Sequence, residues 1–118
     1  MRYLLMLHAD EQAGATIPPD EMAGFLKLLS DYQRDLEAAG AFVATDALMP
    51  STEARCVTRR EGKTLATDGP FTEAKEAFGG YFIIKADTLD QAQTWAARCP
   101  AATWGTVEIR QVRDPGSY

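Results

Sequence analysis

Cysteine and histidine are scarce in this chain of 118 residues, which contains two cysteines and one histidine. Cys56 and Cys99 do not form a CxxC pair, and neither has neighbours at the spacing of metal ligands. The sequence therefore predicts no metal site. Both cysteines lie in apolar surroundings along the chain and are expected to behave as small hydrophobic residues.

Long hydrophobic runs are absent as well. The chain begins MRYLLMLHAD, where the apolar run covers about five residues, far fewer than the ~20 that span a bilayer. The segment also lacks the longer apolar region and the small-residue cleavage site of a signal peptide. We therefore expect a strand here, no membrane segment and a cytoplasmic protein.

Basic residues are outnumbered: 12 lysines and arginines face 17 acidic residues, giving a formal net charge of −5. Nucleic-acid affinity depends on neutralising phosphates, so this balance argues against a nucleic-acid partner. A local basic group at residues 55–63 is expected to lie on the solvated faces of a hairpin. The hydrophobic and charged fractions, 46% and 25%, are ordinary for a soluble globular domain.

Two segments have the pattern of amphipathic helices. The first begins at Pro18-Pro19, carries apolar residues at spacings of three and four, and ends at Gly40 as a left-handed cap. The second begins at Thr88, which forms a capping box with Gln91, and ends before Pro100.

Strand patterns occupy much of the remaining chain. Strands are expected at residues 2–8, 41–48, 81–86 and 106–112, and a hairpin is expected at 54–59 and 63–67 around Glu61-Gly62. Residues 9–17 are expected to be a loop, and a short loop precedes the last strand. The sequence predicts a single domain over 1–113 and a flexible tail at 114–118.

The order of these elements predicts the fold class. Without the inserted hairpin, the chain has the βαββαβ order of a ferredoxin-like α+β domain. Two helices can cover only one face of its sheet, yet the strands at 2–8 and 81–86 are apolar on both sides. A second copy of the chain is the simplest cover for the other face.

Residues 68–84 form the most distinctive segment, DGPFTEAKEAFGGYFII. Gly69-Pro70 indicates a rigid turn, Gly79-Gly80 allows close approach of the backbone, and residues 72–78 are expected to form one or two helical turns. The segment resembles the signature of the DGPF, or YCII-related, family. WGTVEIRQV near the end resembles the closing pattern of that family, and the resemblance covers nearly the whole chain.

The resemblance implies a dimeric α/β-barrel in which two sheets enclose one pocket per subunit. In YCII-like proteins a histidine and the aspartate of a related motif are thought to form a dyad, and Asp68 matches that aspartate. His8 is the only histidine and would have to supply the partner. DGPF-like proteins are often encoded beside extracytoplasmic-function sigma factors, so the resemblance also implies a protein partner of that kind.

The residues leave two interpretations of each dyad member. His8 ends the first strand on the side of Leu4 and Met6, and either bonds to backbone or acts as a general acid or base. Asp68 either accepts a backbone N–H two residues on or takes part in the dyad.

The other candidate residues lie on strands. Glu108 and Arg110 share one face of the last strand, where Arg110 either grips an anionic ligand or joins a cross-strand ion pair. Tyr81 either directs its hydroxyl into a pocket or packs in the core. Glu73, Lys75 and Glu76 are expected on a solvated helical turn, with Lys75 holding the loop in place.

Together these features predict a small cytoplasmic homodimer that binds a small anionic or aromatic metabolite. As an enzyme it would perform cofactor-free acid–base chemistry with Asp68 and His8, while Arg110, Glu108 and Tyr81 bind the substrate. As an accessory or regulatory protein it would instead bind a sigma-factor-related protein. A third option is a dimeric scaffold that binds no ligand, and the sequence leaves open which of the three it is.

Overall fold

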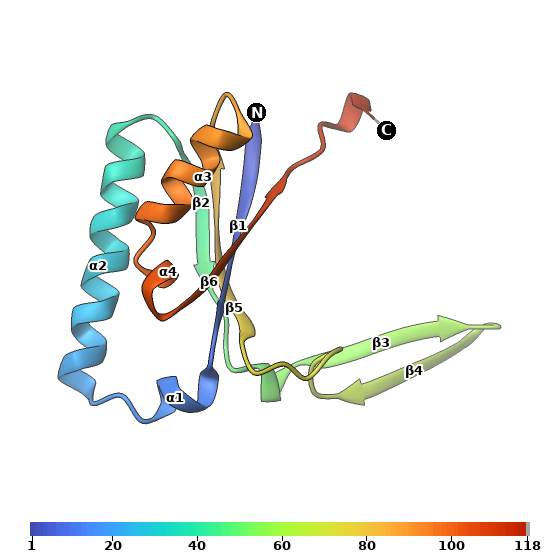
Figure 1. The fold of residues 1–118 in the computed structure, drawn as a ribbon. Coiled ribbons are helices and arrows are strands. Elements are labelled where there is room, and N and C mark those ends of the chain that lie inside the picture. Colours follow the sequence, from blue (N-terminus) through green and yellow to red (C-terminus); the bar gives the residue numbers. More distant parts are fainter. Residues whose placement is uncertain (118) are drawn as a thin grey trace.

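A computed structural model describes residues 1–117 of the chain (Figure 1). Its main sheet consists of β1 (Arg2–Ala9), β2 (Phe42–Ala47), β5 (Ala77–Lys85) and β6 (Gly105–Gln111). The strand order is β2-β5-β1-β6, and all neighbouring strands are antiparallel. The predicted α+β class is confirmed, and the order is compatible with a ferredoxin-like fold.

Helices α2 (Pro19–Ala38) and α3 (Leu89–Arg98) lie on the same side of this sheet (Figure 1). The predicted end of α2 is confirmed: Gly40 has a φ of 69°, and the N–H of Ala41 donates to the carbonyl of Leu36 at 2.9 Å. The start of α3 is also as predicted, since the Thr88 hydroxyl accepts from the N–H of Gln91 at 3.1 Å.

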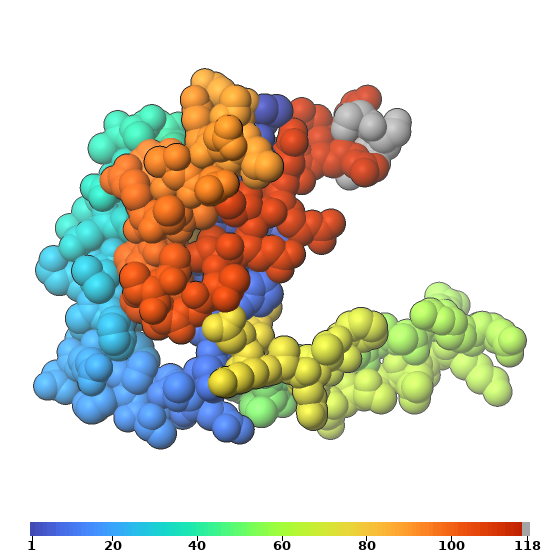
Figure 2. Space-filling model, viewed as in Figure 1, coloured from blue at the N-terminus to red at the C-terminus, as the bar shows by residue number. Residues whose placement is uncertain are grey.

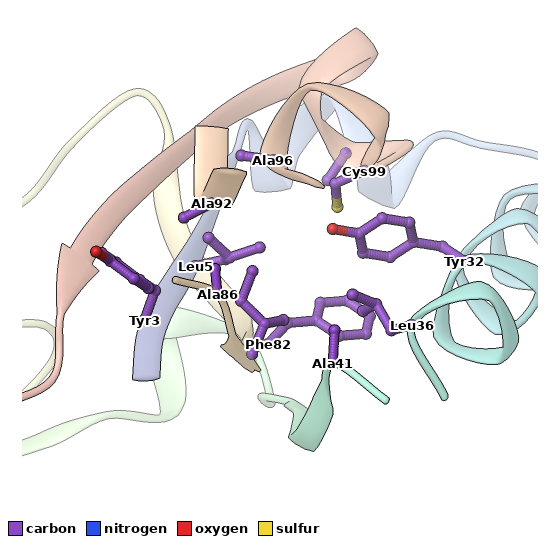
Figure 3. Close-up of a cluster of buried hydrophobic side chains, with 12 residues drawn as sticks. Tyr3, Leu5, Tyr32, Leu36, Ala41, Phe82, Ala86, Ala92, Ala96 and Cys99 are labelled. Carbon is purple, nitrogen blue, oxygen red and sulfur yellow. The ribbon is translucent and has the colours of Figure 1, made fainter. Parts of the chain in front are cut away.

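The hydrophobic core fills the space between this sheet face and the helices (Figure 3). Leu5 and Ile84 from the central strands are fully buried there with Leu36 from α2. Tyr32 packs edge-on against Phe82, with 5.1 Å between ring centroids, and its hydroxyl donates to the carbonyl of Trp95 at 2.7 Å. Burying each large side chain contributes roughly 1.5–3 kcal/mol.

Cys99 belongs to this core, as its apolar context predicted, and burial raises the pKa of its thiol. Cys56 is half-buried, and its Sγ donates to the carbonyl of Gly69 at 3.4 Å. Both cysteines are free thiols.

Two short helices occupy segments that the sequence predicted as loops. Helix α1 (Glu11–Ala15) forms because the Asp10 carboxylate accepts from the N–H groups of Gln12 and Ala13 at 3.0 and 3.2 Å. Helix α4 (Ala101–Trp104) follows Pro100, whose φ of −54° suits the start of a helix. The loop prediction is wrong at both places.

The helical turn expected at residues 72–78 is wrong, and so is the expected start of the following strand at 81. Strand β5 already begins at Ala77, because Ala77 and Phe78 pair with Ala9 and His8 of β1. Of the two glycines in this strand, Gly80 is the one in close contact: a Cβ there would lie 3.0 Å from the carbonyl oxygen of Asp46.

The predicted hairpin is confirmed as β3 (Arg55–Arg60) and β4 (Lys63–Asp68), which form a sheet of their own. Glu61 and Gly62 both have positive φ, 52° and 77°, as a type I′ turn requires. We call residues 55–68 the arm. It extends from the body on the side away from the helices, with open space above it (Figures 1 and 2).

Two short 3₁₀ turns complete the described structure. A 3₁₀ turn, η1 (Ser51–Glu53), precedes the arm, and another, η2 (Pro115–Ser117), follows β6. Tyr118, part of the predicted tail, lies outside the described residues. Among the helices of residues 1–117, none is long and apolar enough to cross a membrane.

Candidate functional site

The sheet face opposite the helices, which we call the open face, brings side chains from all four strands into two rows. In one row Asp46, Tyr81, Met6 and Glu108 are successive neighbours across β2, β5, β1 and β6. In the next row the neighbours are Ala44, Ile83, Leu4 and Arg110. Leu4, Met6 and Ile83 make the centre of the open face apolar, Tyr81 adds a hydroxyl on the central strand β5, and the other polar groups of these rows lie on the outer strands β2 and β6.

His8 lies on this face beside Glu108. Its Nε2 is 3.0 Å from Oε1 of Glu108, and its side chain is 24% exposed. An ionised carboxylate can only accept a hydrogen bond, so Nε2 carries the hydrogen and Nδ1 is the basic nitrogen of the neutral ring. The partner of His8 is therefore a side chain, and the expected backbone bond is not the one formed.

The imidazole of His8 is held from a second side by Phe78, which it meets edge-on with 5.8 Å between ring centroids. Glu76 adds a link beside it, because its carboxylate accepts from the hydroxyl of Thr106, the residue opposite His8 on β6, at 2.7 Å. Glu76, rather than the expected Lys75, thus holds the signature segment, residues 68–84, against the sheet.

Tyr81 forms the second polar pair of the open face. Its hydroxyl donates to Oδ2 of Asp46, directly opposite on β2, at 2.7 Å. This hydrogen bond is the largest cause of a raised pKa for the Tyr81 phenol, followed by loss of hydration and the charge of Asp46. The one hydrogen of the hydroxyl is thus directed to Asp46, and the phenol oxygen can still accept a hydrogen bond.

Arg110 lies two residues from Glu108 on the same face of β6, roughly 6–7 Å along the strand. Its side chain is exposed, and no ion pair joins it to a carboxylate within residues 1–117. The cross-strand pair is made by Glu108 with His8. Arg110 therefore keeps its guanidinium available for an anion.

A groove of about 1060 Å³ begins at His8 and Phe78 and runs under the end of the sheet. Its walls come from α1, η1 and residues 70–77 of the signature segment. Glu11 joins two of these walls, since its carboxylate accepts from the backbone N–H and the hydroxyl of Ser51 at 2.8 and 2.6 Å. The signature segment and His8 thus border the same groove.

Asp68 lies elsewhere, at the base of the arm. Its carboxylate accepts from Nε of Arg55 at 3.2 Å, and both side chains are well exposed. The expected bond to a backbone N–H two residues on cannot form, because that residue is Pro70. Within one described chain no hydrogen bond joins Asp68 to His8, so a dyad of these two residues stays a prediction.

Over residues 1–117, no group of three or more His, Cys, Asp or Glu side chains is arranged to hold a metal ion. The groups suited to chemistry on the open face are an imidazole, a phenol, two carboxylates and a guanidinium.

One member of the open face, Asp46, was missed from the sequence, and the partner of His8 was not identified. Strand alternation predicted which neighbours share a face with Glu108 on its strand and with His8 on its strand. It could not predict that the two residues meet, because that depends on the register between β1 and β6. The contact of Asp46 with Tyr81 likewise depends on the register between β2 and β5. These strands are 30 residues apart in the chain, and their pairing has a register shift near Phe42.

These observations define an α+β domain whose apolar sheet face carries an imidazole, a phenol, two carboxylates and a guanidinium. Residues 1–115 match the YCII-related domain. The chain is also 30% identical over 112 residues to an uncharacterised protein of Rhizobium meliloti (strain 1021), covering 93% of this chain and 90% of that protein. The chain belongs to the YCII-related family, as the DGPF signature indicated.

Proposed function

We propose that the protein is a cytoplasmic homodimer whose open faces enclose a site for a small anionic or aromatic metabolite, on which His8 performs cofactor-free acid–base chemistry. The observation that carries the proposal is the 3.0 Å contact between Nε2 of His8 and Oε1 of Glu108. Glu108 accepts a hydrogen bond from Nε2 and so leaves Nδ1 as the basic nitrogen of the neutral imidazole.

The dimer part of the proposal is supported by the apolar centre of the open face. Leu4, Met6 and Ile83 form adjoining neighbours there and are only partly buried within one chain. A second open face packed against the first would cover them, and the polar groups of the open face would then line the space between the sheets.

In the proposed reaction each polar residue of the site has its own role. Arg110 binds the anionic group of the ligand in a bidentate grip. Nδ1 of His8 takes a proton from the substrate and returns it at another position. The Tyr81 hydroxyl donates its one hydrogen to Asp46, so Tyr81 binds the ligand by accepting a hydrogen bond from it. Asp68 is retained as a catalytic candidate through its place in the family motif, with Arg55 as its partner within the chain.

Benzoate, which is both anionic and aromatic, is a suitable probe of the binding part. We expect it to shift the NMR resonances of the open face, and Arg110→Ala to weaken its binding about tenfold or more, because a charged hydrogen-bonded contact is lost. Arg34→Ala is the matched control, since Arg34 pairs with Asp31 on α2, away from the open face. Equal affinities in the two variants would contradict the proposed anion site.

The acid–base part is tested by hydrogen–deuterium exchange into small oxo acids such as pyruvate in D₂O. A base that removes a C3 proton gives the enolate, which takes up deuterium at the same carbon. We expect exchange to be catalysed by the wild type and lost in His8→Ala. Exchange that is undiminished in His8→Ala would overturn the role of His8.

A second candidate is an accessory protein that binds a partner such as a sigma-factor-related protein. It is favoured by the apolar side chains at the groove, of which Phe71 is 92% and Met49 is 71% exposed. Exposed apolar groups of this kind mark protein-binding surfaces. Failure of every oxo acid to exchange, together with no binding of benzoate, would favour this candidate over the enzyme.

A further inference from the structure

We propose that the arm, residues 55–68, packs against the body of a second copy of the chain, so that the two subunits clasp each other with exchanged arms. The inference rests on the homodimer proposed above and adds to it a second contact, outside the open face. The arm would then serve the assembly of the dimer, a role separate from those of the groove and of the acid–base groups.

Within residues 1–117, the arm has no sheet partner outside itself. Strands β3 and β4 pair through six residue pairs, from Arg55 with Asp68 to Arg60 with Lys63, and with no other strand. Every residue of β4 is exposed, and Cys56 is the one residue of β3 that is not. Because a two-stranded ribbon alone in water is marginally stable, a regular ribbon of this length is expected to lie against another surface.

Each face of the ribbon carries an exposed apolar residue. Val57 lies opposite Ala66 on one face, and Leu65 lies opposite Thr58 on the other. Val57 and Leu65 are both 62% exposed. Contact with protein on either face would remove apolar area from water.

The dimensions of the chain point to a partner of considerable size. Its accessible surface is 8457 Å², whereas a compact monomer of this mass exposes about 6300 Å². Its radius of gyration is 16.4 Å, against about 13.5 Å for a compact domain of equal length. The excess surface, about 2000 Å² per chain, is above the roughly 1000 Å² that a specific interface needs.

Charge favours another copy of the same chain as that partner. The arm contains four basic and two acidic residues, a net charge of +2, which leaves −7 on the rest of a chain whose formal net charge is −5. An arm that reaches a second body therefore meets a surface of opposite net charge. The basic residues are Arg55, Arg59, Arg60 and Lys63.

The direction of the arm supplies the geometry. It leaves the end of the sheet near η1 and extends on the side opposite α2 and α3, past the open face (Figure 1). A second copy that covers the open face would lie on that side, within reach of the arm. Each subunit would offer its arm to the other under two-fold symmetry.

The test combines dimer affinity with hydrogen exchange of the arm amides. The double variant Val57→Asp/Leu65→Asp places charges on both faces of the arm, and Leu28→Asp, on the exposed side of α2, is the matched control. We expect the double variant to raise the dimer dissociation constant at least about tenfold, because a buried unpaired charge is unfavourable. The control should leave it unchanged, and the wild-type arm amides should be protected in the dimer and exchange on dilution.

Unfolding curves of the double variant should match the wild-type monomer, since the arm lies outside the core. A wild-type dimer whose dissociation constant is unaltered by the double variant, with arm amides that exchange freely, would overturn the inference and leave the dimer intact. A chain that remains monomeric would contradict the proposed dimer and the inference together. Protection of the arm only after addition of duplex DNA would assign it to nucleic acid and overturn the inference.

Discussion

His8 and Glu108, a hundred residues apart in the chain, meet on adjacent strands with 3.0 Å between Nε2 and Oε1. The contact is diagonal, because Glu108 lies opposite Met6 and His8 lies opposite Thr106. It forms because β1 and β6 are neighbours in the sheet, an outcome of the crossover through α3 that returns the chain beside its own first strand.

Glu108 is predicted to set the tautomer of His8. In Glu108→Gln the side-chain amide can donate as well as accept, so the preference for hydrogen on Nε2 should fall. Imidazole ¹⁵N chemical shifts of the neutral ring measure this preference. Asp68→Asn is the control, and we expect it to leave the shifts unchanged. A change in Asp68→Asn with none in Glu108→Gln would instead support the dyad predicted from the signature.

Asp46 is predicted to hold the proton on Tyr81. Asp46→Asn removes the carboxylate whose hydrogen bond and charge raise the pKa of the phenol, so that pKa should fall toward the ordinary value of about 10. Near-ultraviolet titration, with Tyr81→Phe to identify the contribution of this tyrosine, measures the change. Asp90→Asn, on α3, should have no effect. An unchanged Tyr81 titration in Asp46→Asn would refute the pair in solution.

Gly105 is predicted to be required for the close approach of β6 and β1. A Cβ at this position would overlap the carbonyl oxygen of His8, which belongs to the backbone and cannot rotate away. Gly105→Ala should therefore destabilise the fold by about 1–3 kcal/mol in urea unfolding. Gly79→Ala, with nothing within 4 Å of the added Cβ, should have a much smaller effect. Similar losses in the two variants would contradict this explanation.

Tyr32 is predicted to make the fold sensitive to alkali. Burial raises the pKa of its phenol well above the ordinary value, so the native state binds this proton more tightly than the unfolded chain. The stabilisation is complete below about pH 10 and is lost as pH rises toward the native pKa. Tyr32→Phe should flatten the fall of the unfolding free energy above pH 10, and parallel curves would argue against it.

The same substitution should cost about 0.5–1.5 kcal/mol at neutral pH, because the hydroxyl no longer donates to the carbonyl of Trp95. Cys99, whose pKa burial also raises, contributes in the same direction. For that reason the comparison is made between Tyr32→Phe and wild type with Cys99 present in both.

Much of the fold was predictable because local signals agreed with tertiary structure. The apolar spacing of α2, its end at Gly40 and the Glu61-Gly62 turn are properties of neighbouring residues. The errors arose where a single contact decided the outcome: the Asp10 side chain capped α1, and pairing with β1 drew Ala77 and Phe78 into β5. Nothing in the local sequence gives the strength of such contacts.

The candidate site was predictable only as single residues. Alternation placed His8 with Leu4 and Met6, and Glu108 with Arg110, but the register that joins one strand to another depends on the whole sheet. Asp46 was missed for this reason, and Asp68 was associated with His8 through the family motif rather than through a contact. Knowledge of the strand order would have narrowed the partners of His8 to residues on β5 and β6.

The central claim, that a second copy covers the open face, is tested most directly by sedimentation equilibrium of the tag-free protein. We predict a mass of twice the 12.9 kDa chain, reduced to the chain mass in Met6→Asp, which places a charge at the centre of the open face. Leu28→Asp on α2 should stay dimeric. A wild type that sediments at 12.9 kDa at every concentration would contradict the dimer and the site between its sheets.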